Sequence, residues 1–211
     1  MPLLDRMLRE SGIEREAIGA IAVAAGPGSF TGLRIGLATA RGLAQGLAVP
    51  AVPVSTLEAL AEAVPTPGAL ICPLLDARRS QVYTALYRRG EKPPYALETL
   101  VEEEALSINA LLEALGRYDQ PVIFLGEGLH SYEADLRKAL PPNRAVITTA
   151  PFRLCRAALV ALRGRHLLQT NPRASYSELL PRYLRRPEAE RLADERQGSG
   201  EGETEEEGGS N

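Results

Sequence analysis

A glycine-rich segment lies between an apolar run and a helical pattern, and this arrangement restricts the fold more than any other feature of the sequence. Residues 18–25 are almost entirely apolar, which is typical of a strand buried on both faces of a parallel sheet. The segment Gly26-Pro27-Gly28-Ser29-Phe30-Thr31-Gly32 follows directly and is expected to form a turn. From Leu33 to Leu47 the apolar positions recur with helical spacing. A buried strand, a turn and a helix in this order predict an α/β fold.

Three well-known kinds of glycine-rich loop do not fit this segment. A Walker phosphate loop ends in Gly-Lys-Ser/Thr, whereas Leu33 follows Gly32 here. A dinucleotide fingerprint and a nucleophile elbow both need glycine at the position of Thr31. The segment could bind an anion through backbone amides at the helix start, serve as a structural turn, or have a role specific to one family. The residues alone leave these three interpretations open.

The rest of the chain alternates between strand and helix patterns. A first helix is predicted over residues 3–11, and Ser55-Thr56-Leu57-Glu58 is a capping box that starts another. Further helices are predicted over residues 56–63, 103–115, 130–139 and 152–168, and strands over residues 51–54, 69–75, 82–87, 95–101, 122–125 and 145–149. The strands over 69–75 and 82–87 are expected to pair antiparallel. Residues 175–186 should be extended or irregular.

Pro65-Thr66-Pro67-Gly68 marks the best domain boundary, because two prolines and a glycine disfavour both helix and sheet. We predict an N-terminal lobe over residues 1–66, a second α/β lobe over residues 67–186 and a disordered acidic tail over residues 187–211. Residues 194–211 hold seven acidic residues and one basic residue, a net charge of −6 that leaves +3 on residues 1–193. Neither part has the concentrated basic charge of a nucleic-acid binder.

Small residues recur at every fourth position of the helix that follows the glycine segment. Gly32, Gly36, Ala40 and Ala44 form one ridge, and Leu33, Leu37 and Leu47 lie on an apolar stripe beside it. Glycine inside a helix costs about 1 kcal/mol relative to alanine, so this ridge needs a compensating close contact with another backbone. That contact is either with the protein's own sheet or with a helix of a second chain. Arg34 and Arg41 either border the contact or are solvated charges.

Residue types that support catalysis are sparse. His130 and His166 are the only histidines and lack the spacing that places two imidazoles on one helix face. Cys72 and Cys155 fit neither a zinc ribbon nor a disulfide framework, and are expected to be buried thiols. Asp76 is the best single candidate for a catalytic carboxylate. No apolar run reaches the ~18 residues of a membrane helix and no secretory signal is present, so a cytoplasmic protein is expected.

The motifs resemble those of the TsaB (YeaZ) family. The resemblance rests first on Ala24-Ala25-Gly26-Pro27-Gly28-Ser29-Phe30-Thr31-Gly32-Leu33-Arg34-Ile35-Gly36, which continues through Ala40-Arg41-Gly42-Leu43 and residues 54–60. The shorter segments Asp76-Ala77-Arg78, Gly126-Glu127-Gly128 and Leu180-Pro181-Arg182-Tyr183-Leu184 are similar to later family motifs. The resemblance covers about residues 3–185.

The resemblance implies a two-lobed actin/sugar-kinase-like (ribonuclease-H-like) α/β fold that has lost its own catalysis. Members of this family pair with a catalytic paralogue, TsaD, through helices that match residues 3–11 and 33–46. With a small ATPase, TsaE, the pair transfers a threonylcarbamoyl group to the adenosine beside the tRNA anticodon. The expected partner interface comprises Leu4, Met7, Leu8, Gly32, Leu33, Gly36, Leu37, Ala40 and Leu43. The expected family motif loop comprises Gly26, Pro27, Gly28, Ser29, Phe30 and Thr31.

The resemblance also sets expectations for ligands and partners. No cofactor or metal is expected on this chain, with ATP and metal on the partner subunits, and tRNA is expected to be reached only through the complex. A homodimer through the same helices is an alternative pairing. The alternative function is an enzyme of the same superfamily, either a threonylcarbamoyltransferase or a metallopeptidase-like hydrolase.

The start of the sequence departs from the family pattern. Family members begin with strand–turn–strand segments that carry an Asp-Thr-Ser loop, whereas this sequence begins within the first helix, at Met1-Pro2-Leu3. We therefore expect a first lobe without its N-terminal strands, and an open edge on the strand over residues 18–25 that is prone to association.

Overall fold

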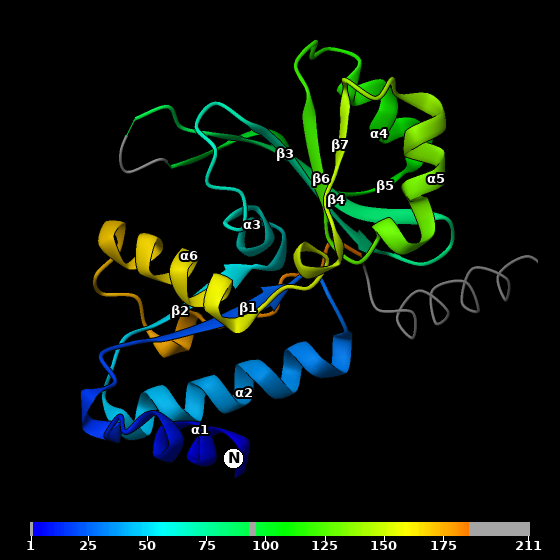
Figure 1. Cartoon of the computed structure of the whole chain (residues 1–211). Helices are drawn as coiled ribbons and strands as arrows, with labels where there is room; N and C mark the ends of the chain where they lie inside the picture. Colours follow the sequence, from blue (N-terminus) through cyan, green and yellow to red (C-terminus); the bar gives the residue numbers. More distant parts are fainter. Residues whose placement is uncertain (1, 93–95, 186–211) are drawn as a thin grey trace, which may run out of the picture.

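The computed structural model describes residues 2–92 and 96–185, which form two sheets with helices on both faces of each (Figure 1). The strands are β1 (Ile21–Gly26), β2 (Ala51–Ser55), β3 (Leu70–Asp76), β4 (Gln81–Arg89), β5 (Leu97–Ser107), β6 (Val122–Leu125) and β7 (Ala145–Ile147). The α-helices are α1 (Pro2–Ser11), α2 (Phe30–Leu47), α3 (Thr56–Ala61), α4 (Ile108–Leu115), α5 (Leu129–Ala139) and α6 (Ala157–Thr170). Short 3-10 helices cover Arg15–Ala17, Ala150–Phe152 and Tyr176–Glu178. None of the helices in the described part has the length and apolar content needed to cross a membrane.

The first sheet confirms the predicted order of strand, turn and helix. β1 and β2 pair in parallel, and α2 packs on one face through Leu37 and Ala44. α6 packs on the other face, where a Cβ added to Gly164 would lie only 2.4 Å from the Cβ of Ala22. This contact shows why glycine occupies position 164, since any larger side chain would push the helix off the sheet. The other edge of β1 has no neighbouring strand among the described residues.

The second sheet has the strand order β5-β4-β3-β6-β7. The predicted antiparallel pair is confirmed as β3 and β4, with Leu74 opposite Thr84, while β6 and β7 continue the sheet in parallel. α4 and α5 cover one face over a core that includes Phe124 and Leu136 (Figure 1). α3 packs on the other face through Leu57. Each of the two sheets is therefore buried on both faces, as their apolar strands predict.

The chain crosses back to the first sheet after β7. The boundary predicted at residues 65–68 separates the two sheets in sequence, but α6 and residues 176–185 pack against β1, β2 and α2. Residues 157–185 therefore belong in space with the first lobe, which corrects the assignment of residues 67–186 to the second. The tail predicted over residues 187–211 lies outside the described residues.

Two helices begin later than predicted. Residues 103–107 belong to β5, which stays paired with β4 as far as Gln81 opposite Ser107, and α4 begins only at Ile108. The Ser107 hydroxyl then caps α4 by accepting from the amide of Ala110 at 3.2 Å. Residues 153–156 likewise precede α6, which begins at Ala157. At residues 103–107 the pairing of β5 with β4 overrides the local helix pattern.

Serine side chains set the starts of α2 and α3. Ser29 accepts from the amide of Gly32 at 3.3 Å, so α2 begins at Phe30, three residues before the predicted start. Ser55 accepts from the amides of Leu57 and Glu58, as the capping box predicts. The reciprocal half of the box does not form, because the Glu58 carboxylate binds the guanidinium of Arg163 at 2.9 and 3.2 Å.

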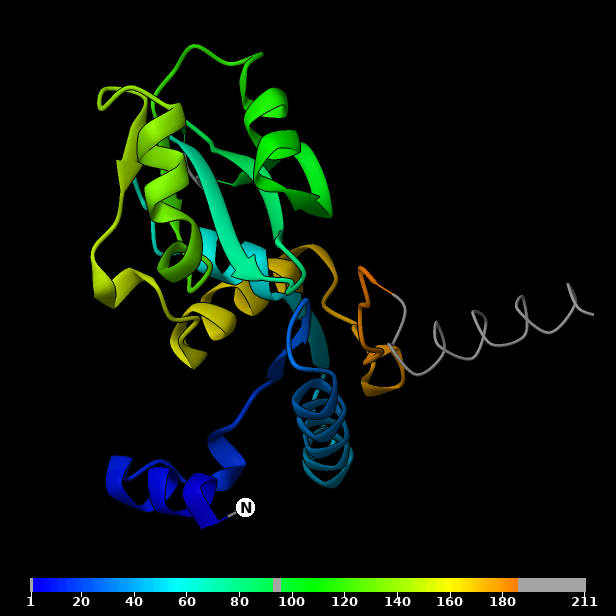
Figure 2. The same cartoon turned by 90° about the vertical axis from the view of Figure 1, so that its right-hand side faces the viewer.

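The first helix confirms the predicted range but has no buried residue. Figure 2 shows α1 standing apart from the rest of the molecule, joined to β1 by residues 12–20. Leu3 and Met7 are 81% and 53% exposed. The apolar side chains of this amphipathic helix are therefore not buried against any other part of the described chain.

Candidate functional site

The motif loop closes against the C-terminal segment of the described chain. Gly26 has φ +122°, and a Cβ at this position would lie 2.5 Å from the carbonyl oxygen of Arg182. The amide of Arg182 donates to the carbonyl of Ala25 at 2.7 Å. Glycine is thus required here both for its backbone conformation and for the close approach of another chain segment. These contacts favour the structural-turn interpretation of the loop.

Two arginines of α2 hold the segment over residues 176–183. The Arg34 guanidinium lies 3.9 Å from the centre of the Phe30 ring and donates to the Tyr183 hydroxyl at 2.9 Å. Phe30 and Tyr183 stack with their ring centres 4.8 Å apart. Arg41 donates to the carbonyls of Tyr176 and Leu179 at 3.2 and 2.9 Å. Arg34 and Arg41 therefore bind this chain's own C-terminal segment, a role that their spacing did not reveal.

A cleft of about 930 Å³ lies between the motif loop and the second sheet. Its lining comes from residues 27–31 and Leu33, from residues 75–79 at the end of β3 and in the β3–β4 turn, and from Tyr83, Glu127 and residues 182–185. The cleft therefore joins four segments that resemble family motifs and are far apart in sequence. Its volume is near the upper end of the range for small-molecule sites.

The β3–β4 turn carries unusual backbone geometry beside this cleft. Arg78, Arg79 and Ser80 all have positive φ, between +52° and +59°. Non-glycine residues in this region store strain, which other contacts must offset. The Asp76 carboxylate supplies one such contact, because it accepts from the Arg78 amide at 2.7 Å. Asp76 was the best sequence candidate for a catalytic carboxylate. In the structure it stabilises a turn at the cleft wall.

A buried carboxylate connects the cleft to the core. The Glu103 side chain, 3% exposed, lies 3.2 Å from the guanidinium of Arg182. It accepts hydrogen bonds from the hydroxyls of Tyr87, at 2.8 Å, and Ser55. Burial and the Glu103 charge raise the pKa of Tyr87, so its hydroxyl stays protonated as a donor. The sequence analysis did not single out Glu103, since a helix was predicted there.

The predicted partner residues divide between buried and exposed positions. Leu33, Leu37 and Ala40 are at most 8% exposed, and pack in the protein's own core. A Cβ added to Gly36 would lie 3.9 Å from the side chain of Val23, so the ridge is turned toward β1. The predicted contact of this ridge with a second chain is therefore corrected to a contact with the protein's own sheet. Of the other predicted positions, Met7 and Gly32 are exposed, and Leu4, Leu8, Gly36 and Leu43 are half-buried.

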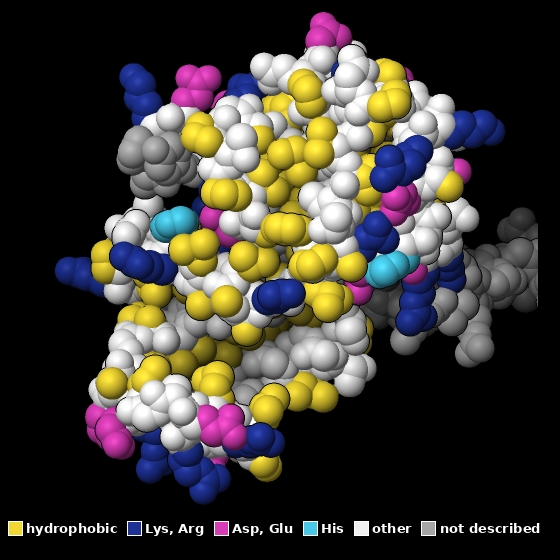
Figure 3. Space-filling model, viewed as in Figure 1, with side chains coloured by type: hydrophobic (Ala, Val, Ile, Leu, Met, Phe, Trp, Pro, Cys, Tyr) yellow, Lys and Arg dark blue, Asp and Glu magenta, His cyan; other side chains and the backbone are white. Residues whose placement is uncertain are grey.

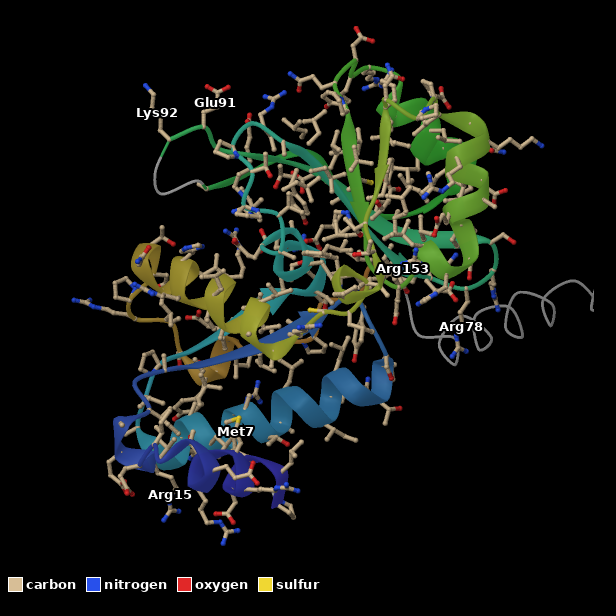
Figure 4. All side chains as sticks on the ribbon, viewed as in Figure 1. Met7, Arg15, Arg78, Glu91, Lys92 and Arg153 are labelled. Carbon is tan, nitrogen blue, oxygen red and sulfur yellow. The ribbon has the colours of Figure 1, made fainter. Side chains whose placement is uncertain are left out.

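A different row of small residues is exposed on α2. Ala38, Gly42 and Gly46 repeat at every fourth position, and a Cβ on either glycine would meet no atom within 4 Å. Ile35 lies beside this row and is 63% exposed. Figure 3 shows hydrophobic side chains around the hollow between α1 and the rest of the molecule, and Figure 4 labels Met7 on α1 beside it. The exposed apolar surface is therefore made by α1 and the outer face of α2.

The described residues offer little catalytic machinery. No group of three or more His, Cys, Asp or Glu side chains within residues 2–92 and 96–185 is placed to hold a metal ion. Burial raises the pKa of the Cys72 thiol to about 12 and that of the Cys155 thiol to about 11, so neither is a ready nucleophile at neutral pH. The two cysteines are free, and His166 lies 3.4 Å from the Glu62 carboxylate.

Comparison with known proteins identifies the family. The family model described as "TsaD: tRNA N6-adenosine threonylcarbamoyltransferase" matches residues 1–193. The tRNA threonylcarbamoyladenosine biosynthesis protein TsaB of Bacillus subtilis is 35% identical over 190 residues, which cover 90% of this chain and 80% of that protein. The TsaB protein of Escherichia coli is 40% identical over 93 residues, 43% of this chain and 40% of that protein.

A solved structure from Pseudomonas aeruginosa, described as an uncharacterized protein with similarity to peptidase YEAZ, superposes with a TM-score of 0.70. It is 27% identical and covers 87% of this chain and 82% of its own. The fold, the motif loop and these matches define a TsaD-like protein with an actin-like α/β fold. Within this class, the chain belongs to the TsaB family of tRNA threonylcarbamoyladenosine biosynthesis proteins.

Proposed function

We propose that this chain is a non-catalytic assembly subunit in tRNA threonylcarbamoyladenosine biosynthesis, and that it pairs with a TsaD-type catalytic paralogue. The observation that carries the proposal is the exposed apolar surface of α1 and α2. A ten-residue helix is marginal in water by itself, and α1 buries none of its side chains. Full burial of a side chain such as Leu3 or Met7 contributes about 1.5–3 kcal/mol. A partner helix packed on this surface would supply that burial.

The outer face of α2 suits a close helix–helix contact. Ala38, Gly42 and Gly46 leave room for another backbone, and Ile35 provides an apolar side chain beside them. Small residues at four-residue spacing allow the ridges of one helix to enter the grooves of another. We place the TsaD-type partner on this face and on α1, with a TsaE-type ATPase joining the pair.

The chemistry is assigned to the partners. Asp76 and Glu103 make contacts within the chain, and both cysteine thiols are protonated at neutral pH. ATP and metal would therefore bind on the partner subunits, and tRNA would be reached through the complex in the cytoplasm. The alternative is that this chain is itself a transferase, which the description of the matching family model favours.

Sedimentation velocity with a TsaD-type subunit tests the pairing. We expect a heterodimer with the wild-type chain, and no heterodimer with Ala38→Arg, because a guanidinium on the outer face of α2 would separate the helices. Ala161→Arg is the matched control, since Ala161 is an exposed alanine on α6. Equal binding by Ala38→Arg would contradict the interface. Gly36→Leu is a poorer test, because its side chain would press on Val23 of β1.

A further inference from the structure

The outer side of α6 and the turn that precedes it are apolar and exposed. Phe152, Leu154 and Leu162 are 42%, 59% and 40% exposed. Three alanines of the same segment are exposed as well, namely Ala157, Ala158 and Ala161. Figure 3 shows hydrophobic side chains in a band across this face of the molecule. Grouped apolar side chains at a surface mark an interaction site, and we call these six residues the α6 patch.

The geometry of α6 turns this patch away from the protein's core. Val160 and Gly164 of the same helix are buried and lie against the first sheet. Leu162 lies on the opposite side, because residues two apart in a helix are separated by about 200° around its axis. α2 covers the other face of the first sheet, so the α6 patch and the outer face of α2 lie on opposite sides of that lobe (Figure 1). A partner on one of these surfaces therefore leaves the other free.

The charges around the α6 patch all have one sign. Residues 150–173 contain no aspartate or glutamate. Arg153 and Arg163 are mostly buried, and each pairs with a glutamate of the chain itself. Arg156 and Arg165 are exposed, and neither pairs with a carboxylate of the residues that the structure describes. An apolar centre with unpaired cations at its edge is complementary to a partner that carries apolar side chains flanked by carboxylates.

We propose that the α6 patch binds an acidic amphipathic helix of another protein. The alanines beside Leu162 leave grooves on α6 that the side-chain ridges of a second helix can enter. Burial of Leu154 and Leu162 supplies the attraction, while Arg156 and Arg165 select for carboxylates and fix the orientation. A nucleic acid would pair with the arginines but would leave the leucines in water. This inference does not depend on the proposed function.

The probe is a synthetic helical peptide with leucines on one face and glutamates on the other, labelled with a fluorophore. Fluorescence anisotropy with the full-length protein should show binding at low salt that weakens as the salt concentration rises, because exposed charges are screened. A second peptide has lysine in place of every glutamate and is otherwise identical. We expect it to bind at least tenfold more weakly, since its cations would face Arg156 and Arg165.

Substitutions at exposed positions locate the peptide on the protein. Leu162→Gln should weaken binding of the acidic peptide about five- to tenfold, and Arg165→Gln about two- to fivefold. The matched controls are Leu3→Gln, at an exposed leucine of α1, and Arg117→Gln, at an exposed arginine that follows α4. Both controls should leave binding unchanged.

Photo-cross-linking gives a second measurement on the wild-type protein. Mass spectrometry of the cross-linked product should place the acidic peptide within residues 152–165. The proposal is overturned if the acidic peptide does not bind, if the lysine peptide binds equally well, if Leu3→Gln weakens binding as much as Leu162→Gln, or if the cross-links lie elsewhere. Tighter binding of a single-stranded RNA of matched charge would assign the surface to nucleic acid and would also overturn it.

Discussion

The Tyr87 hydroxyl donates a 2.8 Å hydrogen bond to Glu103, a carboxylate that is buried where the two sheets meet. The same carboxylate accepts from Ser55 at the start of α3 and pairs with Arg182 on the cleft wall. One side chain thus joins the second sheet, the first sheet and the segment that closes the motif loop. The orientation of the two lobes and the shape of the cleft depend on this contact.

Removal of this carboxylate should destabilise the protein. Glu103→Ala would leave the buried Tyr87 and Ser55 hydroxyls without their acceptor, at a cost of about 2–4 kcal/mol. Urea unfolding measures the loss, and Glu102→Ala, at the exposed neighbouring position, should cost less than about 1 kcal/mol. Similar losses for the two variants would contradict the role of Glu103.

The buried pair of Arg89 and Glu62 gives a second stability prediction. Both side chains are 3% exposed and lie 3.0 Å apart, and Arg89 also donates to the carbonyls of Ala61 and Val64. Arg89→Met should cost about 3–5 kcal/mol, because it removes the nearest cation from the buried Glu62 carboxylate and leaves the carbonyls of Ala61 and Val64 without their donor. Arg88→Met removes a more exposed pair and should cost less than about 1 kcal/mol in the same thermal or urea unfolding.

The Cys72 thiol gives a dependence of stability on pH. Burial raises its pKa from 9.0 to about 12, so the folded state keeps a proton that the unfolded chain loses. This contribution is fully present below pH 9 and is lost as the pH rises toward 12. Between pH 8 and pH 10 we expect it to lower the free energy of unfolding by about 1 kcal/mol. Cys72→Ala should flatten the decline measured by urea unfolding, and an unchanged slope would count against this assignment.

The contact between α2 and the C-terminal segment should control the exposure of that segment to proteases. Tyr183→Phe removes the hydrogen bond from Arg34 but keeps the ring stack, at a cost of about 0.5–1.5 kcal/mol. Tyr183→Ala removes both contacts and should make cleavage within residues 176–185 markedly faster. Trypsin digestion followed by mass spectrometry gives the rates. Equal rates for Ala and Phe would show that the stack does not hold the segment.

Local patterns predicted much of the fold. The apolar run before Gly26 and the helical spacing after it indicated β1 and α2, and the run of β-forming residues from Val82 to Tyr87 indicated β4. These elements are set by side chains close in sequence, so periodicity is sufficient to find them. The predicted starts of α4 and α6 were wrong, and for α4 the reason is the pairing of β5 with β4, which no local pattern shows.

The candidate functional site was harder to predict from the sequence than the fold. The motif loop was found, but its contact with Arg182 joins residues more than 150 positions apart, and no local pattern indicates it. The predicted ridge of small residues is present on α2, but its member Ala40 is buried toward β1. Ala38, which was not part of the predicted ridge, is exposed. Spacing identified a helix with small residues on several faces, and only the position of the sheet decided which of them is exposed.

Reconstituted threonylcarbamoyl transfer to tRNA tests the central claim, that this chain assembles a complex and does not catalyse. The modified adenosine would be quantified by mass spectrometry with TsaD-type and TsaE-type subunits, with and without this chain. We expect product only in the complete mixture, none from this chain alone, and an unchanged rate with Asp76→Asn at saturating subunit concentrations. Product formed by this chain alone, and lost on Asp76→Asn, would contradict the account.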